Sequence, residues 1–144
     1  MRQPLQRAAV AFAIAVGVHG LDHLRRGLMA SPADVVVVGT IQIVIVAVAT
    51  WMALTDRRRA PEVATCVGFA SAVLFFYAHV LPMRWPVLSD SFVSAPHHHV
   101  NWFSWVTAVG EITTGVVLGI TGLRAVKARN RRSYAGTTGY ADHR

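Results

Sequence analysis

A chain of 144 residues with 53% hydrophobic and only 15% charged side chains is too apolar for an ordinary soluble domain. Its net charge of +7 comes from arginines and lysines clustered between apolar runs, a pattern that indicates membrane topology and argues against a nucleic-acid partner. The single cysteine, Cys66, excludes an intramolecular disulfide and a Cys-x-x-Cys metal site.

Four apolar runs follow one another along the chain, at about residues 5–24, 35–54, 63–81 and 100–123. Each is close to the roughly 20 residues that a helix needs to cross about 30 Å of hydrocarbon. Because a backbone in lipid must satisfy its own hydrogen bonds, even the β-branched run VVVVGTIQIVIVAVAT is predicted to be helical. The sequence therefore predicts an all-α integral membrane protein, built as a four-helix transmembrane bundle.

The first run has a competing interpretation as a signal peptide. MRQPLQR supplies a basic start, and AAVAFAIAVG is an apolar core of suitable length. No small-x-small cleavage site follows before the polar stretch HGLDHLRR at residues 19–26. We therefore expect the first helix to be retained.

Arginine and lysine predict the orientation of the bundle. They are concentrated before the first run, between the second and third, and after the fourth. By the positive-inside rule both termini are expected in the cytoplasm, with the other two loops outside the cell membrane. Residues 1–126 then form the transmembrane domain, surrounded by the lipid bilayer, and the basic tail 127–144 is expected to be disordered.

Six histidines gather at the outer end of this predicted bundle, from three regions of the chain: His19 and His23, then His79, then His97, His98 and His99. His19 and His23 are four residues apart on one helical face, a spacing that can bind one metal ion. Asp22 is a candidate third ligand, or an acceptor that orients an imidazole. Such donors suit Zn, Cu or Fe, so the sequence predicts a transition-metal site at the outer face.

Less specific interpretations of these residues remain open. Asp22 can pair with Arg25 or Arg26 at the helix end, and the histidine triplet can be a solvated loop end. His79, like His19, lies about one turn inside the apolar boundary, where polar groups are usually buried and partnered.

The fourth run carries a stripe of polar and small residues at steps of three or four: His97, Asn101, Ser104, Ala108, Glu111, Gly115, Gly119 and Gly122. Gly115 and Gly119 form the small-xxx-small pattern, which allows close helix packing or contact with a membrane-protein partner or a second copy of the chain.

Glu111 is expected near mid-membrane, where a carboxylate must be protonated, paired or facing water. Gln42, Thr107 and Thr114 are candidate neutral partners. The functional alternative is a proton or cation relay.

Two short stretches resemble known families. GEITTGVVLGITGLR, which begins beside Glu111, resembles a glycine-spaced helix of small four-helix DoxX-like membrane proteins, although in that family it falls earlier than the last helix. HGLDH resembles the H-x-x-x-H boxes of membrane di-iron desaturases, although their further boxes are absent here. The DoxX-like resemblance implies a structural or accessory subunit without a cofactor.

Three functions are therefore considered. The first is a multi-pass membrane protein with a metal site at its outer face. The second is a redox subunit in which His19 and His79 ligate haem b, with a quinone near Glu111. The third is an accessory subunit. The sequence shows no nucleophile beside a base, no phosphate loop and no paired carboxylates, so it specifies no reaction.

Overall fold

The computed structural model describes residues 2–27, 30–82, 87–94 and 99–138, with side chains described up to residue 132. Its elements are α1 (Arg2–Arg26), α2 (Ala33–Leu54), α3 (Ala60–Phe75), the π-helical turn η1 (Phe76–Val80) and α4 (Trp102–Thr138). No strand occurs within these ranges. The predicted four-helix, all-α architecture is confirmed, and each of the four helices is long and apolar enough to cross a membrane.

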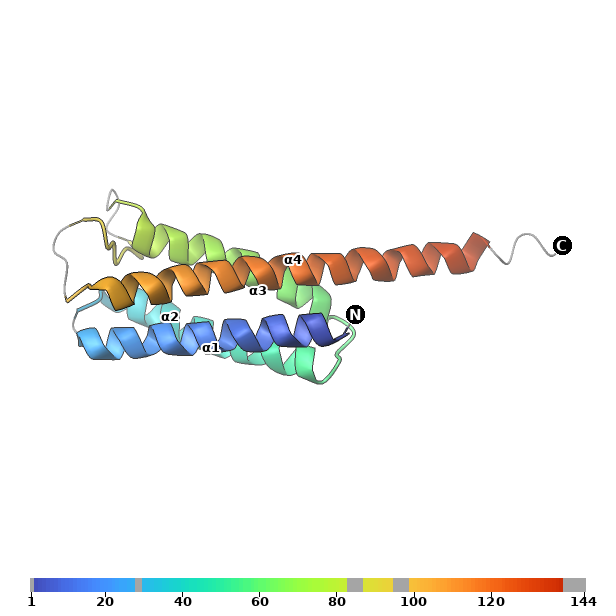
Figure 1. The fold of residues 1–144 in the computed structure, drawn as a ribbon, viewed down its shortest axis with the longest axis horizontal. Helices are drawn as coiled ribbons and strands as arrows, with labels where there is room; N and C mark the ends of the chain where they lie inside the picture. The colour runs from blue at the N-terminus through green and yellow to red at the C-terminus, as the bar shows by residue number, and fades with distance from the viewer. Residues whose placement is uncertain (1, 28–29, 83–86, 95–98, 139–144) are drawn as a thin grey trace.

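The helices run side by side, with α4 packed against α3 and α1, and with α2 against α1 and α3 (Figure 1). The N-terminus lies at the same end as the turn between α2 and α3, and the other two connections lie at the opposite end (Figure 1). An ion pair between Arg2 and Asp56 joins the N-terminus to that turn. This order brings the end of α1 and the end of α3 together.

Local sequence signals begin and end the helices. α1 stops at Gly27, which has a φ of 101° and whose N–H bonds to the carbonyl oxygens of His23 and Leu24. Pro61 lies in the first turn of α3, where a missing N–H costs nothing. Asn101 caps α4, because its Oδ1 accepts a hydrogen bond from the N–H of Phe103 at 2.9 Å.

The end of α4 differs from the expectation. The helix continues to Thr138, past the predicted end at residue 123, so residues 127–138 are helical rather than disordered (Figure 1). The segment LRAVKARNRRSY contains no glycine or proline and is rich in good helix formers. Arg129 also forms an ion pair with Glu62 of α3, which ties this part of the helix to the bundle. The remainder of the predicted tail, 139–144, lies outside the described residues.

The bundle is apolar on its outside and partly polar within. Ile14, Val44 and Val73 are 60%, 60% and 70% exposed, whereas Gln42 and Glu111 are buried. A soluble bundle shows the opposite arrangement, since it buries its large aliphatic side chains to remove them from water. The distribution is what lipid contact on the outer surface requires.

The glycine face of α4 packs against α3 of the same chain. A Cβ atom placed on Gly68 would lie 2.5 Å from the carbonyl oxygen of Gly115 and 2.5 Å from the backbone nitrogen of Gly119. This backbone contact needs glycine on both helices. Of the two alternatives predicted for this face, close helix packing is the one seen within the chain, and it positions α3 relative to α4.

Candidate metal centre

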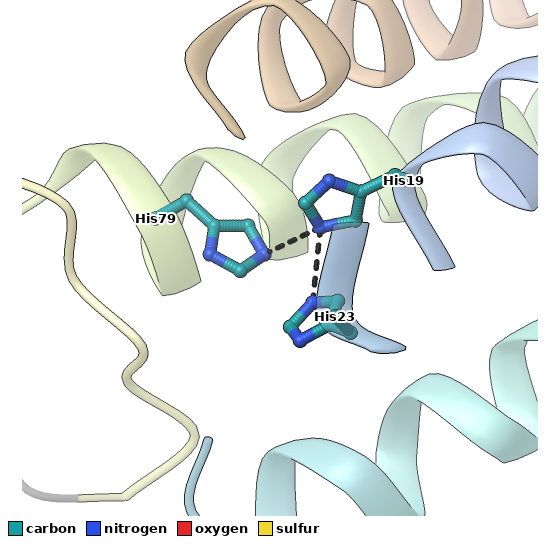
Figure 2. A group of neighbouring side chains, drawn as sticks. All are labelled: His19, His23 and His79. Atoms are coloured by element: carbon teal, nitrogen blue, oxygen red, sulfur yellow. Dashed lines mark hydrogen bonds between the residues drawn. The ribbon is translucent and has the colours of Figure 1, made fainter. Parts of the chain in front are cut away.

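Three histidine side chains meet inside one end of the bundle: His19 and His23 from α1, and His79 from η1 (Figure 2). The Nε2 atom of His19 lies 3.1 Å from Nε2 of His79 and 3.1 Å from Nε2 of His23. One ligand atom from each ring lies within 4.8 Å of the other two. His19 and His79 are buried, and His23 is partly buried. The structure therefore brings three of the predicted residues together.

The position of His79 depends on the π-helical turn. The N–H of Leu81 bonds to the carbonyl oxygen of Phe76 at 3.3 Å, which is the i→i+5 pattern of a wider turn. Such a turn changes the direction of the side chains that it carries, and π-turns are frequent at functional sites. The N–H of Phe92, in the following loop, then bonds to the carbonyl oxygen of His79 at 2.9 Å. Helix end and loop together fix the ring.

Hydrogen bonds at the opposite ring nitrogens orient two of the three rings. The Nδ1–H of His79 donates to the backbone carbonyl oxygen of Asp90 at 3.1 Å. Nδ1 of His19 lies 3.1 Å from Oγ1 of Thr107, whose own proton goes to the carbonyl oxygen of Ser104 at 3.0 Å. These partners assign the proton of each ring to Nδ1. The Nε2 lone pairs of His19 and His79 consequently face each other.

Polar groups at the same end of the bundle hold the third ring. Nδ1 of His23 lies 2.9 Å from Oγ of Ser31 and 3.2 Å from Nη2 of Arg26. Ser31 donates its hydroxyl proton to Oδ2 of Asp90 at 2.9 Å, and Arg26 pairs with the same carboxylate. The ring of His23 is thus attached to the loop that also orients His79.

Arg26 and Asp90 form a buried ion pair. The Arg26 side chain is completely buried and that of Asp90 is 9% exposed. Burial alone raises the pKa of the Asp90 carboxyl, but the hydrogen bond and charge of Arg26 and the hydrogen bond from Ser31 lower that pKa below its ordinary value. The carboxyl is therefore ionised at neutral pH and holds the loop against the end of α1.

Asp22 lies outside the histidine group. Its Oδ1 is 2.8 Å from Nη2 of Arg25, and its Oδ2 is 3.6 Å from Nε of Arg26. The expected ion pair at the helix end is confirmed. Oδ1 of the carboxylate is thus held by Arg25, and Asp22 is not one of the donors whose ligand atoms lie within 4.8 Å of one another.

Glu111 approaches the same histidine group from α4. Its Oε2 lies 3.8 Å from Nε2 of His19, and the side chain is completely buried. Neither carboxyl oxygen has a hydrogen-bond partner among the described residues. The expected neutral partners bind elsewhere: Gln42 donates to the hydroxyl of Ser71, and Thr114 donates to the carbonyl oxygen of Gly110. A buried carboxyl without a hydrogen bond is costly, so the position of Glu111 beside His19 favours a partner for this carboxyl that is not part of the protein.

The remaining predicted residues do not join the group. Asn101 caps α4, as described above. His99 is exposed and lies outside the cluster of three rings. His97 and His98 lie outside the described residues.

A cavity of about 290 Å³ lies beside the rings, between α1, α2 and α3. The three histidines and Glu111 are its titratable groups, Ser31, Thr40 and Gln42 are its neutral polar residues, and the rest of the described lining is apolar. Leu24, Val36 and Ile43 line the cavity and are also 60%, 41% and 51% exposed on the outside of the bundle. The cavity therefore reaches the apolar outer surface between α1 and α2.

Sequence reasoning missed the groups that orient the histidines. Thr107 was expected near Glu111 but holds His19, and Ser31 was not singled out. The sequence contains only a weak signal for the ion pair between Arg26 and Asp90: Asp90 is the one acidic residue between positions 82 and 99, and Arg26 is one of two arginines at the end of α1.

Comparisons with protein-family models, with curated proteins and with solved structures find no match. The function is accordingly argued from the site.

Proposed function

We propose that this protein is a multi-pass protein of the cell membrane that binds one transition-metal ion through His19, His23 and His79. The observation that carries the proposal is the 3.1 Å distance between Nε2 of His19 and Nε2 of His79, in rings whose protons are assigned to Nδ1. Two lone pairs at that distance repel each other unless a cation lies between them. Metal-bound histidines characteristically donate their other N–H to a carbonyl oxygen or a similar acceptor, as these two rings do.

The arrangement suits a single ion such as Zn, Cu(II) or Fe. With metal–nitrogen bonds of about 2.0–2.1 Å, two imidazole nitrogens of a tetrahedral site lie about 3.3 Å apart, close to the two distances of 3.1 Å. The axial imidazoles of a haem lie on opposite sides of the iron, about 4 Å apart at the same bond length. The geometry therefore supports a bound ion over the haem b alternative.

Glu111 supplies the charge that such an ion needs. Three neutral imidazoles would leave a buried dication without compensation, at a high cost in the low dielectric of a membrane interior. The Glu111 carboxyl can supply a compensating negative charge, because its Oε2 lies 3.8 Å from Nε2 of His19. A metal ion would at the same time give its two oxygens the partner that they lack.

The proposed orientation puts both termini in the cytoplasm and the metal site toward the opposite face. The supporting feature is the distribution of cations. Arg57, Arg58 and Arg59 lie in the turn at the end of the bundle that also holds the N-terminus, and the C-terminal part of α4 is basic as well.

Metal analysis of protein purified in mild detergent, with a tag other than polyhistidine, tests the proposal. We expect about one metal ion per chain after reconstitution with Zn, Cu or Fe, and loss of that ion in His19→Ala and His79→Ala. His99→Ala is the matched control and should retain the ion. A wild-type protein that binds none of the three metals, or that binds a metal equally well without His19 and His79, contradicts the proposal. A haem Soret band lost in the same variants would favour the redox subunit.

A further inference from the structure

The cavity beside the histidines has the properties of a ligand site that opens to lipid. Its titratable lining consists of the three imidazoles and Glu111, and most of its other lining is aliphatic, with Ser31, Thr40 and Gln42 as neutral polar residues. Lining side chains such as Val36 and Ile43 are also exposed on the outer surface, where the bundle is apolar. A molecule dissolved in the bilayer can therefore enter between α1 and α2 without crossing a polar surface.

Two glycines leave this passage open. Gly20 of α1 and Gly39 of α2 both line the cavity, and a Cβ atom added to either would meet no atom within 4 Å. This separates them from Gly68, where an added Cβ would meet backbone at 2.5 Å. Packing against a neighbouring helix therefore does not require glycine at either position, and the space that each leaves is part of the cavity.

The lining also restricts the charge and size of a ligand. No lysine or arginine is among the described residues that line the cavity, so away from the metal ion its walls offer no counter-charge to an anionic group. A volume of about 290 Å³ is at the lower end of the range for ligand pockets, which suits the polar end of a molecule whose apolar chain stays in the lipid.

We propose that this cavity binds a neutral, lipid-soluble molecule whose oxygen-bearing end meets the metal ion held by His19, His23 and His79. This inference rests on the proposed metal site. The three imidazoles and Glu111 supply up to four donors, and an ion that expands to five-coordination can take an exogenous oxygen as a further ligand, as in metal sites that act on a ligand. Membrane quinones and long-chain alcohols share the required chemistry, because both join an apolar body to a neutral oxygen.

The test uses Co(II)-loaded protein in lipid nanodiscs, with the visible absorption of the cobalt ion as the readout. The probes are decylubiquinone and 1-decanol, with decane as the control that lacks oxygen. We expect one or both oxygen-bearing probes to shift the cobalt bands at saturating concentration, and decane to leave them unchanged. The probe that acts distinguishes a quinone site from an alcohol site.

Gly39→Leu should fill the cavity and weaken the response to the active probe by at least about tenfold, with the cobalt content unchanged. Gly17→Leu is the matched control, since Gly17 is exposed on α1 and does not line the cavity. Should Gly39→Leu fail to fold, Val36→Trp fills the same space from the outer wall.

The outcomes separate the two proposals. Failure of the wild-type protein to bind cobalt or any of the other metals would remove the metal site and this inference together. Bound cobalt whose spectrum ignores both probes, or responds equally in the filled variants, would overturn the ligand site alone.

Discussion

Oε2 of Glu111 lies 3.8 Å from Nε2 of His19, although the two residues come from the last and the first helix of the bundle. The same nitrogen atom of His19 faces Nε2 of both His23 and His79. Four potential metal donors from three segments of the chain thus converge on one buried position. A carboxyl without a hydrogen-bond partner among the described residues and the facing Nε2 lone pairs of His19 and His79 are separately unfavourable, and one cation relieves both.

Replacement of Glu111 should change metal affinity and apoprotein stability in opposite directions. Glu111→Leu removes an unpaired buried carboxyl, so we expect the metal-free protein to gain about 1–3 kcal/mol in the free energy of unfolding. The same change should weaken metal binding by about 10–100-fold, because the charge beside the ion is lost. Thermal unfolding in detergent and a competition titration with a chelator measure the two effects.

Glu111→Gln is the matched variant for this prediction. It keeps the size and polarity of the side chain but removes the negative charge, so metal binding should weaken while the stability of the metal-free protein stays near that of the wild type. If Glu111→Leu binds metal as tightly as the wild type, Glu111 has no part in holding the ion.

The ion pair between Arg26 and Asp90 should make stability sensitive to acid. The pKa of the Asp90 carboxyl is lower in the folded protein than in the unfolded chain, where it is about 3.9. A lowered carboxyl pKa means that the unfolded state binds the proton more readily, so the pair stabilises the fold fully above about pH 5. That contribution disappears as the pH falls from there through the lowered pKa. Thermal unfolding followed from pH 7 to pH 3 should show the loss.

Asp90→Asn leaves Arg26 buried without its counter-charge, so we expect a loss of about 3–5 kcal/mol at pH 7 and a weaker dependence on acid. Asp56→Asn is the control, because the pair of Asp56 with Arg2 is exposed to solvent and should contribute no more than about 1 kcal/mol. Equal losses of stability in the two variants would show that the burial of the Arg26–Asp90 pair does not increase its contribution to the free energy of unfolding.

The helices could be predicted from sequence far better than the site. Helices that cross lipid must be long and apolar, so composition alone located all four, and His19 and His23 were correctly placed near the end of the first. The direction of the His79 side chain depends on the i→i+5 turn η1, and nothing in the sequence FYAHV predicts such a turn. Helical propensity in residues 127–138 was underestimated because a basic, small-residue tail suggested disorder.

Partners of polar side chains could be predicted within one helix but not between helices. Asp22 lies one turn before two arginines, and that local pairing is what the structure contains. The sequence predicts Gln42 as a neutral partner of Glu111, but Gln42 donates its hydrogen bond to Ser71. Such choices depend on which helix faces are neighbours, and a single sequence with no contact information does not determine them.

The proposed orientation predicts which loops can be labelled from outside the cell. In a Cys66→Ala background, Val93→Cys puts a thiol in the loop before α4, and Asp56→Cys puts one in the turn between α2 and α3. A membrane-impermeant maleimide should label Val93→Cys in intact cells and Asp56→Cys only after permeabilisation. The reverse pattern would invert the bundle and put the histidine site toward the cytoplasm. Cys66 must be removed first because it is exposed.

The packing of α3 on α4 should control the site from a distance. Gly68→Ala puts a methyl group 2.5 Å from backbone atoms of Gly115 and Gly119, which cannot move without shifting a whole helix. We expect a loss of about 1–3 kcal/mol in stability, measured by thermal unfolding. The shift should also separate His79, which α3 carries through η1, from Glu111 of α4, and so weaken metal binding.

Gly110→Ala is the control for this effect, because an added Cβ at Gly110 would meet no atom within 4 Å. It should leave stability unchanged or raise it by up to about 1 kcal/mol, since alanine restricts the unfolded chain and favours the helix. A Gly68→Ala protein that is less stable but binds metal with unchanged affinity would show that the donors adjust to the displaced helix. Equal loss of affinity and stability would instead show that the α3–α4 contact holds His79 and Glu111 within reach of one ion.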